Sequence, residues 1–189
     1  LLEFGKARCH VVGFDVDATK TEALERGESY IRHIDAERIR SLFVDGDSAS
    51  ATTDFSRIPE CDALLICVPT PLTQYRDPDL RYVTATAESL APHLRRGQLV
   101  SLESTTYPGT TDEVLRSILE KGSALTAGED FYLAYSPERE DPNNAKFNTA
   151  TIPKVVGGLT PDSLEIACAL YILVICETVP VSSCRAAEA

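Results

Sequence analysis

Short apolar segments alternate with amphipathic segments along the whole chain of 189 residues. The apolar segments have the length of strands, and the amphipathic segments have the length and periodicity of helices. The sequence contains no internal repeat and no low-complexity segment. Such alternation is typical of a mostly parallel sheet with helices on both of its faces. The sequence therefore predicts an α/β fold, a Rossmann-like doubly wound parallel sheet.

The flanking residues place the expected elements along the chain. Strands are expected at 11–14, 61–68, 99–102, 131–135 and 178–181, and helices at 19–26, 82–94, 111–121 and 162–173. The run at 61–68 is almost entirely apolar, which predicts a strand buried on both faces. Thr160 and Pro161 are residue types favoured at the N-cap and first position of a helix. Ser182 or Ser183 is expected to begin a further helix.

Charge and cysteine usage narrow the possible partners. The 18 Lys and Arg residues face 29 Asp and Glu residues, so the net charge is −11. A chain this acidic has no general attraction for nucleic acid or for an anionic membrane, and we expect neither partner. The longest apolar run, 166–176, has 11 residues, fewer than the roughly 20 of a membrane span. The six scattered cysteines predict no metal site and a reduced, cytoplasmic chain.

Residues that directly follow the strands are the candidate functional residues, because ligands bind at the carboxyl ends of parallel strands. Here they are Asp15, Thr70, the segment 104–106 and Glu138. An acidic residue placed like Asp15, about 20 positions after a glycine-rich loop, binds the ribose hydroxyls of NAD and disfavours the 2′-phosphate of NADP. Only 14 residues precede Asp15, so we expect the first strand and the glycine-rich loop to lie upstream of the chain. Alternatively, Asp15 or Asp17 only caps the next helix.

Three further polar segments each have a functional and a structural interpretation. Thr70 is held between two prolines, which fix the backbone around its hydroxyl, or it belongs to an ordinary loop. The hydroxyl-rich segment 103–111 could hold a water or a sugar, although one of its threonines could simply be an N-cap. The charged segment 138–141 could supply a base or orient a water, or it could be a solvated charge run.

Several motifs occur together and in order along the chain. They are G-F-D-V-D at 13–17, R-G-E-S-Y-I at 26–31, C-V-P-T-P-L at 67–72, S-L-E-S-T-T-Y-P-G-T-T at 101–111, Y-S-P-E-R-E-D-P at 135–142, I-P-K-V-V-G-G at 152–158 and V-P-V-S-S at 179–183. Through this set the chain resembles the nucleotide-sugar dehydrogenase family, the UDP-glucose and GDP-mannose 6-dehydrogenases. Within it, the chain is most similar to the bacterial UDP-N-acetylglucosamine 6-dehydrogenases.

The resemblance implies roles for particular residues. Asp15 would bind the NAD ribose with Lys20 beside it, while Thr70 and Thr105 would line the nicotinamide side of the pocket. Glu138 would be the catalytic glutamate that activates water for thioester hydrolysis, and Thr105 would help to position that water. Glu138 and Arg139 would also face the nucleotide sugar.

The resemblance also implies a reaction. Enzymes of this family use NAD to oxidise C6 of a nucleotide sugar twice, from alcohol to aldehyde and then, through a cysteine thioester, to the carboxylate. We expect UDP-N-acetylglucosamine as the substrate, for surface polysaccharide biosynthesis. The alternatives are a UDP-glucose 6-dehydrogenase and a non-catalytic Rossmann remnant.

The implied organisation is that of a truncated dehydrogenase. Residues 1–181 would form a partial NAD-binding domain, and residues 182–189 would begin the central helix that leads to a substrate and dimerisation domain. The family's catalytic cysteine and lysine would lie beyond residue 189, so we expect these 189 residues to be inactive alone. The full-length protein would be a homodimer or a higher assembly.

Overall fold

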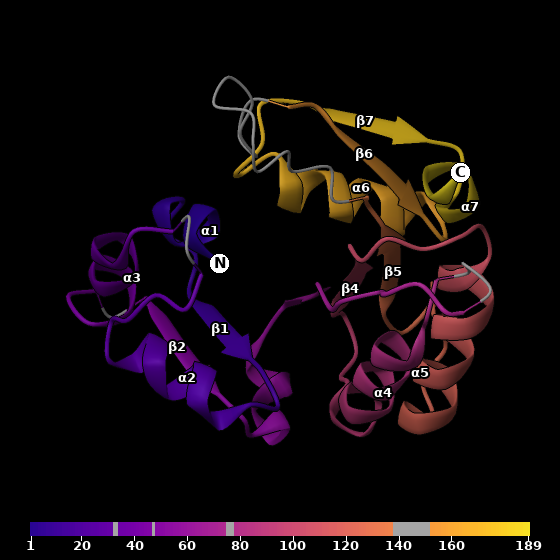
Figure 1. Ribbon diagram of the computed structural model, residues 1–189. Helices are drawn as coiled ribbons and strands as arrows, with labels where there is room; N and C mark the ends of the chain where they lie inside the picture. The colour runs from indigo at the N-terminus through magenta and orange to yellow at the C-terminus, as the bar shows by residue number, and fades with distance from the viewer. Residues whose placement is uncertain (32–33, 47, 75–77, 138–151) are drawn as a thin grey trace. The chain divides into compact units, whose positions relative to one another are not determined.

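The computed structural model of the chain describes residues 1–31, 34–46, 48–74, 78–137 and 152–189. Its contacts divide the chain into two compact units, Leu1–Phe55 and Ser56–Ala189. Each unit contains its own sheet, as the strands in Figure 1 show. None of the helices in these described segments is long and apolar enough to span a lipid bilayer.

The first unit is a parallel pair of strands covered by short helices. Strand β1 (Val11–Phe14) pairs in parallel with β2 (Ala49–Thr52), with Val11 opposite Ala49. The helices of this unit are α1 (Leu2–Lys6), α2 (Ala18–Glu25) and α3 (Ala36–Phe43).

Helix α3 supplies most of the core of this unit. Asp35 begins the helix, because its carboxylate accepts a hydrogen bond from the backbone N–H of Glu37 at 3.0 Å. Ile39, Leu42 and Phe43 follow at a spacing that places them on one helix face, and all three are buried. They pack with Leu24 of α2 to form one apolar cluster. Sequence reasoning did not predict α3 or β2.

The second unit contains a five-stranded sheet in the order β3-β4-β5-β6-β7. Its strands are β3 (Ala63–Ile66), β4 (Leu99–Leu102), β5 (Tyr132–Tyr135), β6 (Lys154–Gly158) and β7 (Thr178–Val181). The first three pair in parallel, β5 and β6 pair antiparallel, and β6 and β7 pair in parallel. The predicted Rossmann-like α/β fold with a mostly parallel sheet is therefore confirmed.

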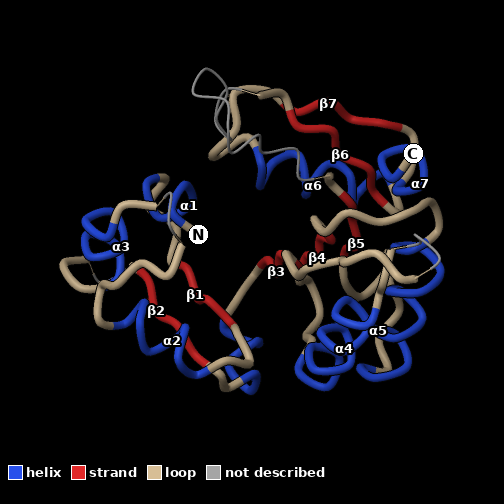
Figure 2. The backbone as a smooth tube through the Cα atoms, viewed as in Figure 1, coloured by secondary structure: helices blue, strands red, loops and turns tan. Residues whose placement is uncertain are grey.

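Helices cover this sheet (Figure 2). They are α4 (Arg81–Leu90), α5 (Arg116–Ser123), α6 (Pro161–Tyr171) and α7 (Cys184–Glu188), with shorter helical segments η2 (Ala91–His93) and η3 (Thr110–Leu115). A further short helical segment, η1 (Phe55–Glu60), follows β2 in the chain. Helix α6 packs against β4, β5 and β6, and α4 lies beside α5. The predicted caps are confirmed: Thr160 accepts from the N–H of Ser163, and Ser183 from the N–H of Ala186.

One expected helix of this unit has an irregular start, and one expected strand is less buried than predicted. The helix expected at 111–121 starts as the π-helical segment η3 and continues as α5. Strand β3 buries only Leu64 and Ile66, while its other two residues are half-buried. Successive side chains of a strand point to opposite faces of the sheet, so one face of β3 is better covered than the other, whereas all four residues of its neighbour β4 are buried.

Strand β1 has one neighbour among the described residues, β2, and β3 likewise has one, β4. Among the described residues, β1 and β3 are therefore both edge strands, each hydrogen-bonded to a neighbour on one side only.

Candidate functional site

Asp15 directly follows β1, at the carboxyl end of the strand. Its Oδ1 accepts a hydrogen bond from the backbone N–H of Asp17 at 2.9 Å, and its Oδ2 accepts one from Lys20 Nζ at 3.1 Å. Asp17 is the N-cap of α2, because its Oδ1 accepts from the backbone N–H of Thr19 at 3.0 Å. The two aspartates therefore have different roles: Asp17 caps the helix, and Asp15, at the strand end, pairs with Lys20.

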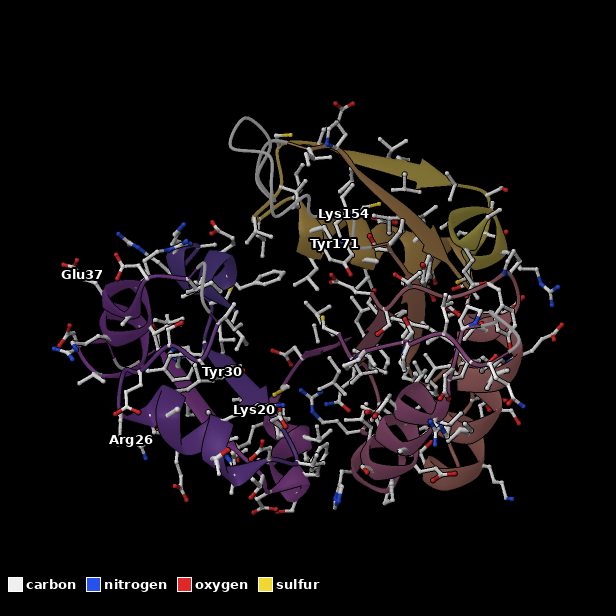
Figure 3. The ribbon with its side chains drawn as sticks, in the orientation of Figure 1. Lys20, Arg26, Tyr30, Glu37, Lys154 and Tyr171 are labelled. Carbon is white, nitrogen blue, oxygen red and sulfur yellow. The ribbon has the colours of Figure 1, made fainter. Side chains whose placement is uncertain are left out.

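The Asp15–Lys20 pair remains open to a ligand. The side chain of Asp15 is 32% exposed and that of Lys20 is 41% exposed. The hydrogen bond to Asp15 raises the pKa of Lys20, so Lys20 stays charged. Burial raises the pKa of the Tyr30 phenol, and the charge of Asp15 adds to this effect. Lys20 and Tyr30 are labelled in Figure 3, where both belong to the first unit. The carboxylate can accept further hydrogen bonds, as a ribose diol would require.

In the second unit, Ser104 joins the ends of β3 and β4. Its hydroxyl donates to the carbonyl of Val68 at 2.7 Å and accepts from the backbone N–H of Val68 at 2.9 Å. Thr70 lies two residues further along the same loop and is half-buried. The Ser104 side chain therefore anchors the segment that carries Thr70.

A cavity of about 410 Å³ lies at the carboxyl ends of β4 and β5. It is lined by Thr105, Thr106, Tyr135, Pro137, Val155 and residues 186–189. Thr105 is exposed at this cavity, whereas the hydroxyl of Thr106 is hydrogen-bonded to that of Thr110. Burial, with a smaller contribution from the charge of Glu188, raises the pKa of Tyr135 to about 12. Tyr135 therefore offers a protonated phenol at neutral pH.

Glu188 forms one side of this cavity and is itself buried. Its carboxylate accepts hydrogen bonds from the backbone N–H of Gly109 at 2.7 Å and from the backbone N–H of Thr111 at 2.8 Å. It thereby holds α7 against the start of η3. The predicted helix start at 182–189 thus contributes a wall of the cavity.

A larger depression of about 540 Å³ lies elsewhere in the second unit. It is lined by Asp112, Glu113, Arg116, Ser117, Glu120 and Lys121, which all belong to η3 and α5. Arg116 is paired with Glu120 at 2.9 Å. None of these six lining residues lies at the end of a strand, so the smaller cavity is the better candidate site.

The structure places the predicted site residues in two groups. Asp15 and Lys20 are paired in the first unit, and Thr105 lines the cavity of the second. Thr70 lies in the second unit but is not among the residues that line the cavity. Glu138 and Arg139 lie outside the described residues, directly after Pro137, which does line it. That all of these residues share one crevice stays a prediction.

Sequence reasoning missed a buried polar cluster beside this cavity. It comprises Ser101, Glu103, Lys154 and Tyr171, which come from β4, the residue after it, β6 and α6. Its members are joined by hydrogen bonds of 2.7 to 3.3 Å. Glu103 and Lys154 belong to motifs noted above, but no motif or pattern in the sequence indicated a role for Tyr171. Among the described residues, no group of three or more His, Cys, Asp or Glu side chains could hold a metal ion.

Comparisons with known proteins agree on one family. Residues 2–175 match the model of the UDP-glucose/GDP-mannose dehydrogenase family, NAD binding domain. The chain is 35% identical over 189 residues to a UDP-N-acetyl-D-glucosamine 6-dehydrogenase of Pseudomonas aeruginosa, covering all of this chain and 44% of that protein. It is 34% identical over 191 residues to a UDP-N-acetyl-D-mannosamine dehydrogenase of Yersinia pestis, covering 98% of this chain and 45% of that protein.

Solved structures give the same result. An NDP-N-acetyl-D-galactosaminuronic acid dehydrogenase of Methanosarcina mazei Go1 superposes with a TM-score of 0.89 at 36% identity, covering 99% of this chain and 42% of that one. The chain thus spans less than half the length of the relatives that it matches. It belongs to the UDP-glucose/GDP-mannose dehydrogenase family, of which it contains the NAD-binding domain.

Proposed function

We propose that residues 1–189 are the NAD-binding part of an enzyme that oxidises the C6 hydroxyl of a UDP-sugar to the carboxylate. The observation that carries the proposal is the half-buried but accessible Asp15–Lys20 pair at the carboxyl end of a parallel strand, in a domain of this family. We take UDP-N-acetylglucosamine as the substrate, because that is the substrate named for relatives at 35% identity over the whole chain. A surface polysaccharide would then be the destination of the product.

Asp15 fits the ribose of NAD. Its carboxylate keeps lone pairs for two ribose hydroxyls, while Lys20 Nζ donates to its Oδ2 at 3.1 Å. A 2′-phosphate at the same place would meet the negative charge of Asp15, so NAD is favoured over NADP. When bound, NAD accepts the hydride that leaves C6 in each of the two oxidations.

The cavity at the ends of β4 and β5 fits the hydrolytic step. Thr105 presents an exposed hydroxyl there, with which it would position a water. Glu138, the residue after Pro137, would take a proton from that water as it attacks the thioester. Thr70 would lie on the nicotinamide side of the pocket, and Arg139 would face the nucleotide sugar. The cysteine that forms the thioester would be supplied from outside these 189 residues.

The experiment that tests this proposal uses the complete enzyme, that is, the full-length polypeptide that contains residues 1–189. NADH formation is followed with UDP-N-acetylglucosamine, UDP-N-acetylgalactosamine and UDP-glucose in parallel. We expect UDP-N-acetylglucosamine to give the highest kcat/KM. A preference for UDP-glucose would establish the alternative substrate, and no NADH with any of the three would overturn the proposed activity.

Glu138→Gln tests the hydrolytic step in the same polypeptide. The amide cannot accept the water's proton, so the steady-state rate should fall by a factor of about 100 or more while a covalent sugar–enzyme adduct accumulates in the mass spectrum. Glu165→Gln is the matched control, because Glu165 is exposed on α6. Equal rates for both variants would remove Glu138 from the mechanism.

The cellular setting follows from the same proposal. We place the enzyme in the cytoplasm, since its six cysteines show no disulfide pattern.

We also propose that the complete protein forms a homodimer or a higher assembly through the helix that begins at residues 182–189. Size-exclusion chromatography with light scattering would measure the mass of this assembly.

A further inference from the structure

Strands β4 and β6, helix α6 and the residue after β4 meet at one buried chain of hydrogen bonds in the second unit. The hydroxyls of Ser101 and Tyr171 are 2.7 Å apart, and Tyr171 donates to Glu103 Oε1 at 2.8 Å. Lys154 Nζ donates to Glu103 Oε2 at 3.3 Å. All four residues are at most 8% exposed. Both carboxylate oxygens of Glu103 are therefore occupied, one by a phenol and one by an ammonium group.

Lys154 also reaches a backbone carbonyl. Its Nζ donates to the carbonyl oxygen of Pro137 at 3.4 Å, and it lies 5.0 Å from the centroid of the Tyr171 ring. Figure 3 shows Lys154 and Tyr171 next to each other. Pro137 lines the candidate cavity and is the last described residue before Glu138. The buried ion pair is thus connected to the point where the chain leaves β5.

A second hydrogen bond runs parallel to this connection. The hydroxyl of Ser136 donates to the carbonyl of Val155 at 2.6 Å. Ser136 and Pro137 precede residues 138–151, while Lys154 and Val155 follow them. Two adjacent bonds therefore join the described residues on either side of that segment.

Stability alone is a weak explanation for the ion pair. Moving both charges out of water costs several kcal/mol per ion, and apolar replacements of buried pairs are often neutral or stabilising. An apolar residue at position 154 could fill the same space, but it could not donate to the Pro137 carbonyl. The pKa of Tyr171 is raised well above its usual value by burial and then by the charge of Glu103. Tyr171 consequently remains a hydrogen-bond donor to Glu103 at any ordinary pH.

We propose that Lys154 is a positioning residue of the dehydrogenase, oriented by Glu103 and Tyr171, which fixes the Pro137 carbonyl and so holds the backbone that follows β5 at the wall of the cavity. This inference rests on the proposed function, because it assigns the network a purpose at the cavity where that function places the hydrolytic step.

The test compares three variants of the complete enzyme. Lys154→Met removes the donor but leaves the Glu103 carboxylate buried and unpaired, which could unfold the protein. The double variant Glu103→Gln/Lys154→Met removes both charges and keeps an acceptor for Tyr171, so it should stay folded. Lys154→Arg keeps the charge and the donors. Lys121→Met is the matched control, since Lys121 is exposed on α5.

Two measurements are made on each variant. Amide hydrogen exchange of peptides that contain residues 136–139 reports whether the strand end is held, independently of catalysis. In the double variant we expect faster exchange there, a kcat lower by about 10- to 100-fold and an unchanged KM for NAD. Lys154→Arg should recover part of kcat, and Lys121→Met should match the unaltered enzyme.

The outcomes separate this inference from the proposed function. Unchanged exchange at 136–139, or an unchanged kcat in the double variant, would overturn the positioning role even if Glu138→Gln is inactive. Normal turnover by Glu138→Gln would instead overturn the assigned role of that glutamate, and the positioning role with it. An equal loss of kcat and of NAD binding would show general damage to the domain and would also overturn the inference.

Discussion

Glu188 accepts two hydrogen bonds from Thr111, one from its backbone N–H at 2.8 Å and one from its hydroxyl at 2.6 Å, although 77 residues separate them in the chain. Thr111 lies in the first turn of η3, where backbone N–H groups have no partner within the helix. A carboxylate is also the favourable charge at a helix N-terminus. The last residue of α7 therefore completes the start of a distant helical segment.

Removing this carboxylate should destabilise the protein. Glu188→Ala leaves the buried N–H groups of Gly109 and Thr111 without an acceptor, which should lower the free energy of unfolding by about 3 kcal/mol. Urea unfolding followed by circular dichroism measures the change. Glu165→Ala, at an exposed site on α6, should shift stability by no more than about 0.5 kcal/mol. Equal effects of the two substitutions would contradict the role of Glu188.

Asp15→Ser should change the cofactor preference of the complete enzyme. Without the carboxylate at the end of β1, a 2′-phosphate no longer meets a negative charge, and NAD loses a hydrogen-bond acceptor. We expect the ratio of kcat/KM for NADP to that for NAD to rise by about tenfold or more. Asp45→Ser is a control in the same unit, because Asp45 is exposed. A ratio that stays constant would show that Asp15 does not contact the ribose.

Stability should fall at alkaline pH because of Cys184. Burial, and then the charge of Glu188, raises the pKa of this thiol from 9.0 to about 12. The folded protein therefore keeps the proton that the unfolded chain releases above about pH 9. The free energy of unfolding should decrease by about 1.4 kcal/mol per pH unit from there up to about pH 12.

Cys184→Ala isolates this contribution. The variant lacks the thiol, so its stability should depend less steeply on pH between about pH 9 and about pH 10.5 than that of the unaltered chain. Tyr135 adds its own slope in both proteins, because its pKa is also raised to about 12. If the free energy of unfolding depends on pH in the same way in both proteins, the Cys184 thiol does not cause the alkaline loss of stability.

Gln98 should tolerate neither a carboxylate nor an apolar side chain. Its amide nitrogen donates to the carbonyls of Ile58 at 3.0 Å and Cys61 at 2.6 Å, and its amide oxygen accepts from the N–H of Arg95 at 2.7 Å. Gln98→Met leaves the backbone N–H of Arg95 without an acceptor, while the two carbonyls keep their other donors, the Cys61 N–H and the Arg95 guanidinium; the cost should be about 1 to 3 kcal/mol.

Gln98→Glu should cost more at neutral pH, because a buried carboxylate would face two carbonyl oxygens. Burial raises the pKa of such a carboxyl, so the variant should regain stability relative to Gln98→Met as the pH falls from about 7 to about 5. Denaturant midpoints at both pH values measure this. If Gln98→Glu is as stable as the unaltered chain at neutral pH, the hydrogen bonds of Gln98 are not as described.

Much of the fold could be predicted because local patterns carry it. The strands at 11–14, 99–102 and 178–181 are found at the predicted bounds, since each is a short apolar or β-branched run between polar or turn-forming residues. The β2 segment Ala49–Thr52 was missed, because its small residues give no strand pattern and only pairing with β1 makes it a strand. Strand β6 and its antiparallel pairing with β5 were also missed, because the direction in which two strands pair is decided by the tertiary structure.

The sequence by itself determined the alternation of elements and the positions of Asp15, Thr70 and Thr105 after strands, because the hydrophobic period and the residues that end a strand are local properties. Only the tertiary structure decided which polar groups are paired. It showed that Asp17 rather than Asp15 caps α2, and that Glu103 meets Lys154 and Tyr171. The partner of a buried polar group is chosen by burial and geometry in space. Residues such as Glu103 and Tyr171, 68 positions apart, share no local pattern that could reveal the contact.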